Sequence, residues 1–267
     1  MDDPSEVSER DDSWSLLGSG KLTEVWTNGS HVRRPLRPWS ASVHQLLKLF
    51  EKKGLTGVPR FVRTDRNFEV LTFLTGTAIR RPWPPSIQSA AWLVRLGAWL
   101  RRSHAATRGF QLSEDLCFAW GSSMPSPTDV VTHGDLGPCN MLENDGAFAG
   151  VIDWDLARFG SPLDDLAEVA FELGPLRENR DMLPNETTHQ QILARIEALC
   201  RGYGGVTVKQ VLSYVEPMFI RRMHEMQALA DAGRAPFESL VAAGNIEALE
   251  EDLRYYRRQL FTTDFSG

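Results

Sequence analysis

The chain has 267 residues and a mass of 30.0 kDa, enough for one large domain or for two small lobes that each bury a core. Its composition, with 42% hydrophobic and 24% charged residues, is ordinary for a globular protein. The formal net charge of −6 argues against a nucleic-acid-binding protein, because phosphate backbones require clustered lysine and arginine. No apolar run approaches the roughly 20 residues that span a bilayer, so no membrane partner is expected either.

The first 13 residues and the three cysteines bear on where the chain resides. Residues 1–13 are rich in Asp, Glu and Ser and lack the basic and apolar regions of a secretory signal, so we expect a loose acidic tail. Cys117, Cys139 and Cys200 lie far apart without C-x-x-C spacing, which favours neither a disulfide framework nor a zinc site. Reduced thiols in the cytoplasm are the simpler interpretation.

Residues 14–75 have the pattern of a small sheet with one helix, which we expect to form an N-terminal lobe. Asn28-Gly29 lies between two strand-like runs, which is a strong hairpin signal. Ser40 can cap a following helix, because apolar residues recur after it at i, i+3, i+4 and i+7. This apolar stripe comprises Val43, Leu46, Leu47 and Phe50. The predicted strands cover residues 14–17, 22–26, 30–34, 61–63 and 68–73, with a break at Gly18-Ser19-Gly20.

Residues 76–267 change to a mostly helical pattern. Gly76 and the following cluster of prolines are a plausible hinge between two lobes. Short buried strands are expected at 130–132 and 151–152, with a turn at Asn144-Asp145-Gly146 between them. The predicted helices cover residues 87–104, 163–173, 189–203, 209–231 and 246–260.

The segment from His133 to Asn140 matches the catalytic-loop pattern of kinases. His133, Asp135 and Asn140 occupy the fixed places of that pattern, and only its arginine is replaced, by Gly134. In such a loop the aspartate orients or accepts the proton of the attacking hydroxyl, while the asparagine oxygen reaches a magnesium ion. The sequence therefore predicts Asp135 as the catalytic residue and Asn140 as a metal ligand.

Asp153 follows Asn140 by thirteen residues, after the apolar stretch Gly150-Val151-Ile152. A hairpin of that length would return Asp153 beside Asn140 and form an oxygen-rich pair suited to Mg2+, which usually takes few protein carboxylates. The alternative is that Asp135 and Asp153 are ordinary turn and cap residues. The kinase-like spacing of three polar residues favours the metal-site interpretation.

The stretch from Gly18 to Val25 fits the glycine-rich loop that covers nucleotide phosphates, with Thr23 in the place of the third glycine. A plain β-turn would explain these glycines equally well. If Asn28-Gly29 is a two-residue turn, Val25 pairs with Val32 and Thr23 pairs with Arg34. The four side chains would then lie on one face and offer apolar contacts to a purine and a cation to phosphates. The candidate residues of this loop are Gly18, Ser19, Gly20, Thr23 and Val25.

Arg34, or Arg33 if the register slips by one, stands where a protein kinase places a lysine paired with a helix glutamate. Arginine can hold phosphate oxygens bidentately, so the replacement is chemically tolerable. The helix from Ser40 offers only Glu51, near its end, so the usual ion pair is missing. A solvated surface arginine remains the alternative for either residue.

Together these residues resemble the aminoglycoside-phosphotransferase and choline-kinase-like family. The resemblance runs from about Trp14 onward and is carried by the loop from His133 to Asn140, by Val151-Ile152-Asp153-Trp154 and by Asp164-Asp165-Leu166-Ala167. It implies an α+β, bilobal protein-kinase-like fold with a small antiparallel-sheet N-lobe and a mostly helical C-lobe. It also implies Mg2+ held by Asn140 and Asp153, and a purine lying against residues 71–76, with Phe73 and Leu74 as contacts.

The expected activity is transfer of the γ-phosphoryl group of Mg-ATP or Mg-GTP to a hydroxyl of a small molecule. Family resemblance does not fix the acceptor. Five carboxylates could line an anionic acceptor pocket, namely Asp155, Asp164, Asp165, Glu168 and Glu172. It is more plausible that Asp164 and Asp165 cap a helix and brace the catalytic loop, and that Glu168 and Glu172 are a solvated helix face. A non-catalytic nucleotide-binding regulatory protein is the alternative function, and a protein kinase is disfavoured because no D-F-G or A-P-E sequence is present.

Overall fold

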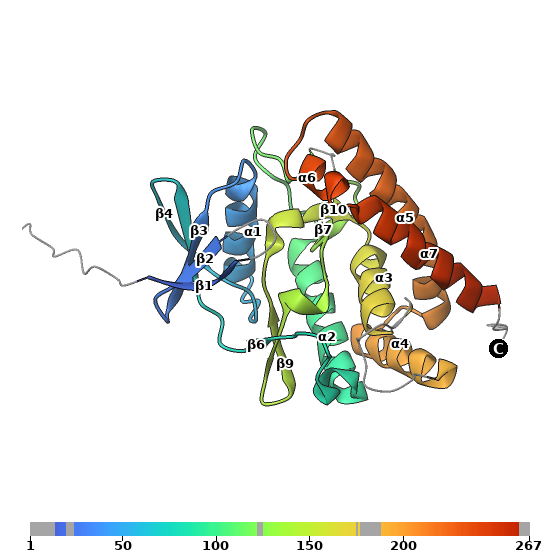
Figure 1. Cartoon of the computed structure of the whole chain (residues 1–267). Coiled ribbons are helices and arrows are strands. Elements are labelled where there is room, and N and C mark those ends of the chain that lie inside the picture. Colours follow the sequence, from blue (N-terminus) through green and yellow to red (C-terminus); the bar gives the residue numbers. More distant parts are fainter. Residues whose placement is uncertain (1–13, 20–23, 122–124, 175, 177–187, 262–267) are drawn as a thin grey trace, which may run out of the picture.

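The computed structural model describes residues 14–19, 24–121, 125–174, 176 and 188–261, so the expected acidic tail lies outside the described residues. An antiparallel sheet with one helix forms the N-lobe, and a mostly helical C-lobe lies beside it (Figure 1). The predicted α+β, bilobal fold is therefore confirmed. No helix in the described part of the chain is long and apolar enough to cross a membrane.

The N-lobe sheet has five antiparallel strands in the order β1-β2-β3-β5-β4. The strands are β1 (Ser15–Ser19), β2 (Glu24–Thr27), β3 (His31–Pro35), β4 (Phe61–Asp65) and β5 (Phe68–Thr72). Helix α1 (Ser40–Lys52) carries the predicted apolar stripe, whose four side chains are all 0–1% exposed. Burial of this stripe fixes α1 in the fold, because helices in proteins are stabilised mainly by packing of one apolar face.

Strand β1 extends further than predicted. Gly18 and Ser19 lie within it, paired with Val25 and Glu24, so the expected break at Gly18 is wrong. The register shifts between Leu16 and Gly18, as at a β-bulge, and a glycine is a common residue at such a shift. Gly20 and Thr23, the other loop candidates, lie outside the described residues.

The hairpin between β2 and β3 is confirmed, but its predicted register is wrong by two residues. Thr27 pairs with Val32 and Trp26 with Arg33, because the turn lies at Gly29-Ser30 instead of Asn28-Gly29. Gly29 has φ 87° and takes the first central position, where a two-residue turn of type II′ requires glycine. The Asn28 side chain accepts hydrogen bonds from the next two backbone N–H groups beyond Gly29. A slip of two residues preserves the alternation of side chains, so Val25, Val32 and Arg34 still share one face.

The C-lobe helices agree with the predicted ones, with one correction and one addition. They are α2 (Ala90–Thr107), α3 (Pro162–Leu173), α4 (His189–Tyr203), α5 (Val208–Asp231), α6 (Phe237–Ala242) and α7 (Asn245–Phe261). Helix α2 begins at Ala90 instead of residue 87, because Ser89 caps it and accepts a hydrogen bond from Trp92 N, and it ends at Thr107 instead of residue 104. The short 3-10 helix η1 (Pro85–Gln88) precedes it. Helix α6 was not predicted, since six residues carry too little periodicity.

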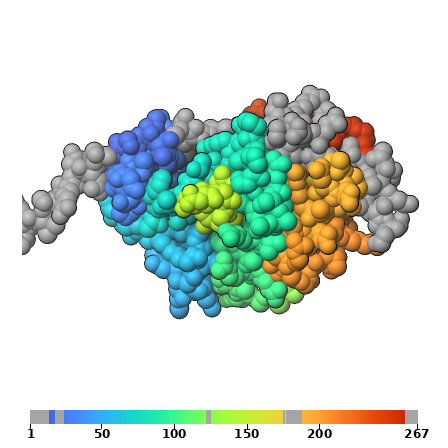
Figure 2. Space-filling model, turned by 90° about the horizontal axis from the view of Figure 1, so that it is seen from below, coloured from blue at the N-terminus to red at the C-terminus, as the bar shows by residue number. Residues whose placement is uncertain are grey.

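Two small sheets hold the catalytic-loop segment. One pairs β7 (Val130–Thr132) with β10 (Arg158–Gly160), and the other contains β6 (Thr77–Ala78), β8 (Met141–Asn144) and β9 (Ala147–Val151) in the order β6-β8-β9. Val151 N donates to Gly57 O at 2.8 Å, which ties this second sheet to the segment after α1. Figure 2 shows the yellow-green hairpin of β8 and β9 at the surface, beside the green residues of α2. The segment between β7 and β8 is therefore held at both ends.

Candidate active site

The catalytic-loop segment is fixed through His133, which is fully buried. Asp165 on α3 accepts hydrogen bonds from His133 N, at 3.0 and 3.1 Å, and also contacts Nε2 of the buried His104 at 3.0 Å. The His133 ring contacts Ile152 O through Nε2 at 2.9 Å. The predicted role of Asp165 as a brace of this loop is thus confirmed.

Gly134 replaces the arginine of the kinase pattern for a steric reason. It has φ 78°, and a Cβ atom at this position would lie 1.9 Å from Leu156 O. Backbone atoms cannot yield to such an overlap, and L-residues other than glycine rarely adopt this φ. Glycine at this position lets the backbone of η3 (Trp154–Leu156) lie directly against the loop.

Asp135 is oriented by Asn140, whose Nδ2 donates to Asp135 Oδ2 at 3.0 Å and to Asp135 O at 2.8 Å. Asp135 is an exposed residue, but neighbouring protein groups displace part of the water around its carboxyl group. This desolvation raises the pKa of Asp135, and the negative charges of Glu168 and Asp153 raise it further, while His133 and Arg222 oppose the shift. A carboxylate with a raised pKa is a better proton acceptor, which suits the predicted role.

Asp153 lies beside Asn140, as predicted from the hairpin length. Ile152 N donates to Asn140 O at 2.9 Å, and Met141 pairs with Val151 at the end of the hairpin. Asp153 has φ 64° and ψ 68°, a left-handed conformation that is rare for a residue other than glycine. Such backbone strain is concentrated at functional sites, where the surrounding structure sustains it.

The pair Asn140 and Asp153 has a donor set that fits Mg2+. Because Asn140 Nδ2 is engaged with Asp135, its amide oxygen is left to coordinate, and Asp153 supplies a carboxylate that is 47% exposed. Among the described residues, no three side chains of His, Cys, Asp or Glu form a group that could hold a metal. A site with one amide and one carboxylate suits Mg2+, which keeps several waters and shares the nucleotide phosphates.

Arg34 connects the N-lobe sheet with the C-lobe. Its Nη1 donates to Asp153 Oδ1 at 2.9 Å and its Nη2 donates to Asp155 Oδ1 at 2.5 Å. The neighbouring Arg33 points to the other face, where its guanidinium lies 4.6–5.7 Å from three aromatic rings, those of Trp14, Trp26 and Phe68. Of the two arginines that the sequence left open, the structure places Arg34 at the site.

Glu69 and His44 were not identified from the sequence. Glu69 on β5 accepts from Arg34 Nε at 2.6 Å and is only 1% exposed, and His44 on α1 donates to its second oxygen. The sequence offered no helix glutamate near this position, and the carboxylate comes from a strand instead. One signal was present, because a glutamate within the apolar run Phe68 to Leu71 is unusual unless it is paired.

Trp154, which follows Asp153, joins the catalytic loop to α1. Its ring lies 4.7 Å from the His133 ring and 4.9 Å from the Phe50 ring, between centroids, and it is 3% exposed. Aromatic contacts of this kind add to the stability gained from burial. The position of α1 is therefore coupled by packing to the loop that carries Asp135.

Two further acidic candidates, Asp164 and Glu168, are paired within the protein. Asp164 completes the capping box of α3 with Ser161 and contacts Arg221, so the expected helix cap is confirmed. Glu168 is 6% exposed and pairs bidentately with Arg222 at 2.7 and 3.0 Å, so the interpretation of Glu168 as part of a solvated face is wrong. It is buried because α5 packs against α3, a contact that helical periodicity alone does not reveal.

The nucleotide-side candidates lie on one face of the β2–β3 hairpin, which holds Val25 and Val32, and in the segment after β5, which holds Phe73 and Leu74. Val25, Val32, Phe73 and Leu74 are each partly buried. Phe73 N donates to Ser30 O at 2.9 Å, which fixes the segment after β5 against the turn between β2 and β3. The segment that carries two of the predicted purine contacts thus lies beside the hairpin that carries the other two, and their role stays a prediction.

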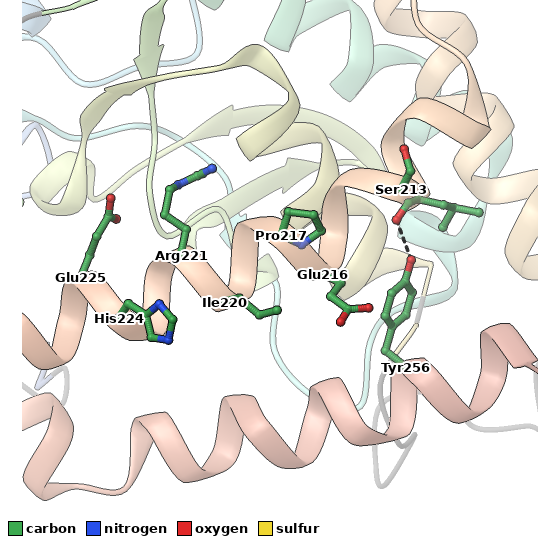
Figure 3. Close-up of a pocket in the computed structure, with 9 residues that line it drawn as sticks. Ser213, Glu216, Pro217, Ile220, Arg221, His224, Glu225 and Tyr256 are labelled. Atoms are coloured by element: carbon green, nitrogen blue, oxygen red, sulfur yellow. Dashed lines mark hydrogen bonds between the residues drawn. The ribbon is translucent and has the colours of Figure 1, made fainter.

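A separate pocket of about 670 Å3 lies between α5 and α7, lined by eight residues of α5 and by Tyr256 of α7 (Figure 3). Tyr256 donates to Leu212 O at 2.7 Å across it. Its charged side chains Glu216, Arg221 and Glu225 pair with Arg257, Asp164 and Arg158, respectively. No residue from 133–140 lines this pocket, so it is not part of the catalytic-loop site.

Comparisons with known proteins agree with this geometry. Residues 115–207 match the model of the phosphotransferase enzyme family. The chain is 33% identical over 152 residues to the trifolitoxin immunity protein of Rhizobium leguminosarum bv. trifolii, and this match spans 55% of the chain and 56% of that relative. The chain therefore spans about half the length of the curated relative that it matches.

Two solved structures share the fold over most of their length. A macrolide 2′-phosphotransferase from Brachybacterium faecium is 19% identical with a TM-score of 0.56, over 86% of this chain and 90% of that one. An amicoumacin kinase in complex with AMP-PNP and Ca2+ is 12% identical with a TM-score of 0.62, over 91% and 89%. At these identities the likeness shows the fold alone. The segment that carries the catalytic loop thus matches the phosphotransferase enzyme family, within a chain that has the fold of small-molecule phosphotransferases.

Proposed function

We propose that this protein transfers the γ-phosphoryl group of a magnesium-bound ATP or GTP to a hydroxyl group of a small molecule. The observation that carries the proposal is the proximity of Asp135, Asn140 and Asp153, with Arg34 reaching Asp153 from the N-lobe. In this proposal residues 14–75 hold the nucleotide and residues 76–267 hold the catalytic loop and the acceptor. The three described cysteines are free, which supports a cytoplasmic location.

Each side chain has a defined task in the proposed reaction. Asp135 accepts or orients the proton of the acceptor hydroxyl, and Asn140 holds Asp135 in place through Nδ2. Asn140 Oδ1 and Asp153 would hold Mg2+, which neutralises charge on the phosphates. Arg34 can turn its Nη1 and Nη2 groups from the aspartates to phosphate oxygens. Positioning and charge neutralisation supply the rate enhancement, without a covalent enzyme intermediate.

The charges around the catalytic loop bear on the acceptor. Asp164 and Glu168 are paired with Arg221 and Arg222, and Asp165 is engaged by the catalytic loop. These three carboxylates therefore do not present unpaired negative charge to a polycation, and only Asp155 would be released when Arg34 turns to the phosphates. We propose an acceptor alcohol that is neutral or carries few positive charges, with macrolides and amino-acid alcohols ahead of aminoglycosides.

The test is magnesium-dependent release of ADP or GDP by the purified chain against macrolides, aminoglycosides, choline and amino-acid alcohols. We expect one acceptor to stimulate release, and we expect Asp135→Asn to abolish that stimulation while nucleotide still binds. Stimulated release that survives in Asp135→Asn would contradict the assignment of the catalytic residue. Nucleotide binding without turnover on any acceptor would favour the non-catalytic alternative. The absence of a helix glutamate favours that alternative, whereas Glu69 supplies Arg34 with a carboxylate partner from a strand.

A further inference from the structure

We infer that Glu69 and His44 are positioning residues that hold the Arg34 guanidinium toward the nucleotide phosphates, and so replace the lysine–helix glutamate pair that this chain lacks. The inference rests on the proposed function, because it assigns a phosphate contact to Arg34. It concerns two residues on different elements: Glu69 on a strand contacts Arg34, and His44 on a helix contacts Glu69.

The contacts form a continuous series from α1 to the C-lobe. His44 on α1 donates through Nε2 to Glu69 Oε2, and Glu69 Oε1 accepts from Arg34 Nε at 2.6 Å. The Arg34 Nη1 and Nη2 atoms then contact Asp153 and Asp155, as described above. Because Glu69 engages only Nε, it leaves the two terminal nitrogens to face the boundary between the lobes. These are the nitrogens that bind two oxygens of a phosphate side by side.

The backbone sets this arrangement. Arg34 and Glu69 are directly opposite each other in the ladder between β3 and β5, so their side chains leave the sheet on the same face. Helix α1 covers that face, and His44 is 7% exposed at the position where the helix meets β4. The His44 ring is stacked on Phe61 of β4, with 4.0 Å between centroids and 30° between planes. His44 is therefore held on its other side by packing, which restricts the position of the Glu69 carboxylate.

Charge and burial explain why both partners are needed. Burial alone would raise the pKa of Glu69, but the hydrogen bond from His44 and the positive charge of Arg34 lower it. Glu69 therefore stays ionised at neutral pH, although it is almost fully buried. If Glu69 lost its charge, Asp153 and Asp155 would be the only anions among the described residues that hold Arg34, and both belong to the C-lobe. The arginine would then be held by the metal-site carboxylates rather than by its own sheet.

The experiment compares binding of a purine nucleoside triphosphate with binding of the matching nucleoside. Isothermal titration calorimetry with Mg2+ identifies whether the wild type binds ATP or GTP, and the same titration with adenosine or guanosine isolates the purine contacts. The variants are Glu69→Gln, His44→Leu and His44→Gln, the last of which keeps a donor for Glu69. The control is Glu51→Gln, which removes an exposed carboxylate from the same helix as His44.

We expect Glu69→Gln to weaken triphosphate binding by roughly tenfold or more, since a charge-assisted hydrogen bond is lost. His44→Leu should act in the same direction by a smaller factor, and His44→Gln should restore most of the affinity. Nucleoside binding and the Glu51→Gln control should match the wild type. This difference between the two ligands is the signature of a positioning role, because general damage to the lobe would weaken both.

Two results would overturn this inference and leave the proposed function standing. One is a parallel loss of triphosphate and nucleoside binding in Glu69→Gln and His44→Leu, and the other is unchanged triphosphate binding in both variants. If Glu69→Gln does not fold, the comparison of His44→Leu with His44→Gln decides the question by the same criteria. A wild-type chain that binds neither Mg-ATP nor Mg-GTP would instead overturn the proposed function, and the inference with it.

Discussion

Nη1 of Arg34 on β3 lies 2.9 Å from Oδ1 of Asp153, so a cation of the N-lobe sheet contacts the carboxylate proposed to hold Mg2+. In the proposed site a divalent cation would bind the same carboxylate as the guanidinium, and the two would compete for it. Asp155, which also contacts Arg34, lies two residues further along the chain. The affinity of the bare protein for divalent cations should therefore depend on Arg34.

The first prediction is that Arg34→Ala binds Mn2+ more tightly than the wild type in the absence of nucleotide. Removal of the guanidinium frees Asp153 and Asp155, and an increase of roughly tenfold corresponds to the loss of one charge-assisted hydrogen bond. Calorimetric titration of Mn2+ into EDTA-treated protein measures the change. Arg33→Ala is the matched control, because its side chain lies among aromatic rings on the other face. Unchanged or weaker Mn2+ binding in Arg34→Ala would argue against Asp153 as a ligand.

The second prediction concerns Gly134. We expect Gly134→Ala to lower the free energy of unfolding by about 3 kcal/mol or more, since a strained φ and an overlap with Leu156 O are both introduced. Gly146→Ala is the matched control, with φ 72° but no atom closer than 3.7 Å to the new Cβ, and it should cost only about 1 kcal/mol. Urea denaturation measures both variants. Equal losses in the two would show that the contact with Leu156 O does not matter.

The sequence predicts those parts of the molecule that depend on neighbours along the chain. The α1 stripe follows from helical spacing, and the closeness of Asn140 and Asp153 follows from the length of a hairpin. The predicted register of β2 against β3 is wrong, because the register depends on which two residues form the turn. Asn28-Gly29 looks like the turn in the sequence, yet the Asn28 side chain bonds the backbone after it and moves the turn to Gly29-Ser30.

The pairs of charged residues at the site could not be predicted in this way. Arg34 and Glu69 are 35 residues apart, and Glu168 and Arg222 are 54 residues apart. Their contacts depend on the order of strands in the sheet and on the packing of α3 against α5. A charged residue in an otherwise apolar run indicates that a partner exists, but it does not identify that partner.

The third prediction links Asp155 to the pH dependence of stability. Burial raises the pKa of Asp155 to about 6, with Arg34 opposing the shift and Asp153 and Glu69 adding to it. Since its pKa in the unfolded chain is near 4, Asp155 contributes stability below about pH 4 that is lost as the pH rises through about 6. The loss amounts to roughly 3 kcal/mol for a shift of about two pKa units.

Urea denaturation between pH 4 and 7, in EDTA, tests this linkage. The free energy of unfolding of the wild type, minus that of Asp155→Asn, should fall as the pH rises across this range. The same difference taken with Asp115→Asn, a variant of an exposed aspartate, should stay flat. A flat difference for Asp155→Asn would show that its carboxyl group titrates alike in the folded and unfolded chain.

The fourth prediction uses the Glu168–Arg222 pair to shift the titration of Asp135 in opposite directions. Desolvation by neighbouring protein groups is the main cause of the raised pKa of Asp135, the Glu168 charge adds to it, and Arg222 opposes it. Glu168→Gln should therefore lower the pKa of Asp135, and Arg222→Gln should raise it. If ionised Asp135 accepts the proton, the acidic limb of the pH profile of kcat/KM reports this pKa. That limb should move to lower pH in Glu168→Gln and to higher pH in Arg222→Gln. Because both variants break the same buried pair, a shift in one common direction would indicate structural damage, and no shift in either would exclude Asp135 as the group that titrates.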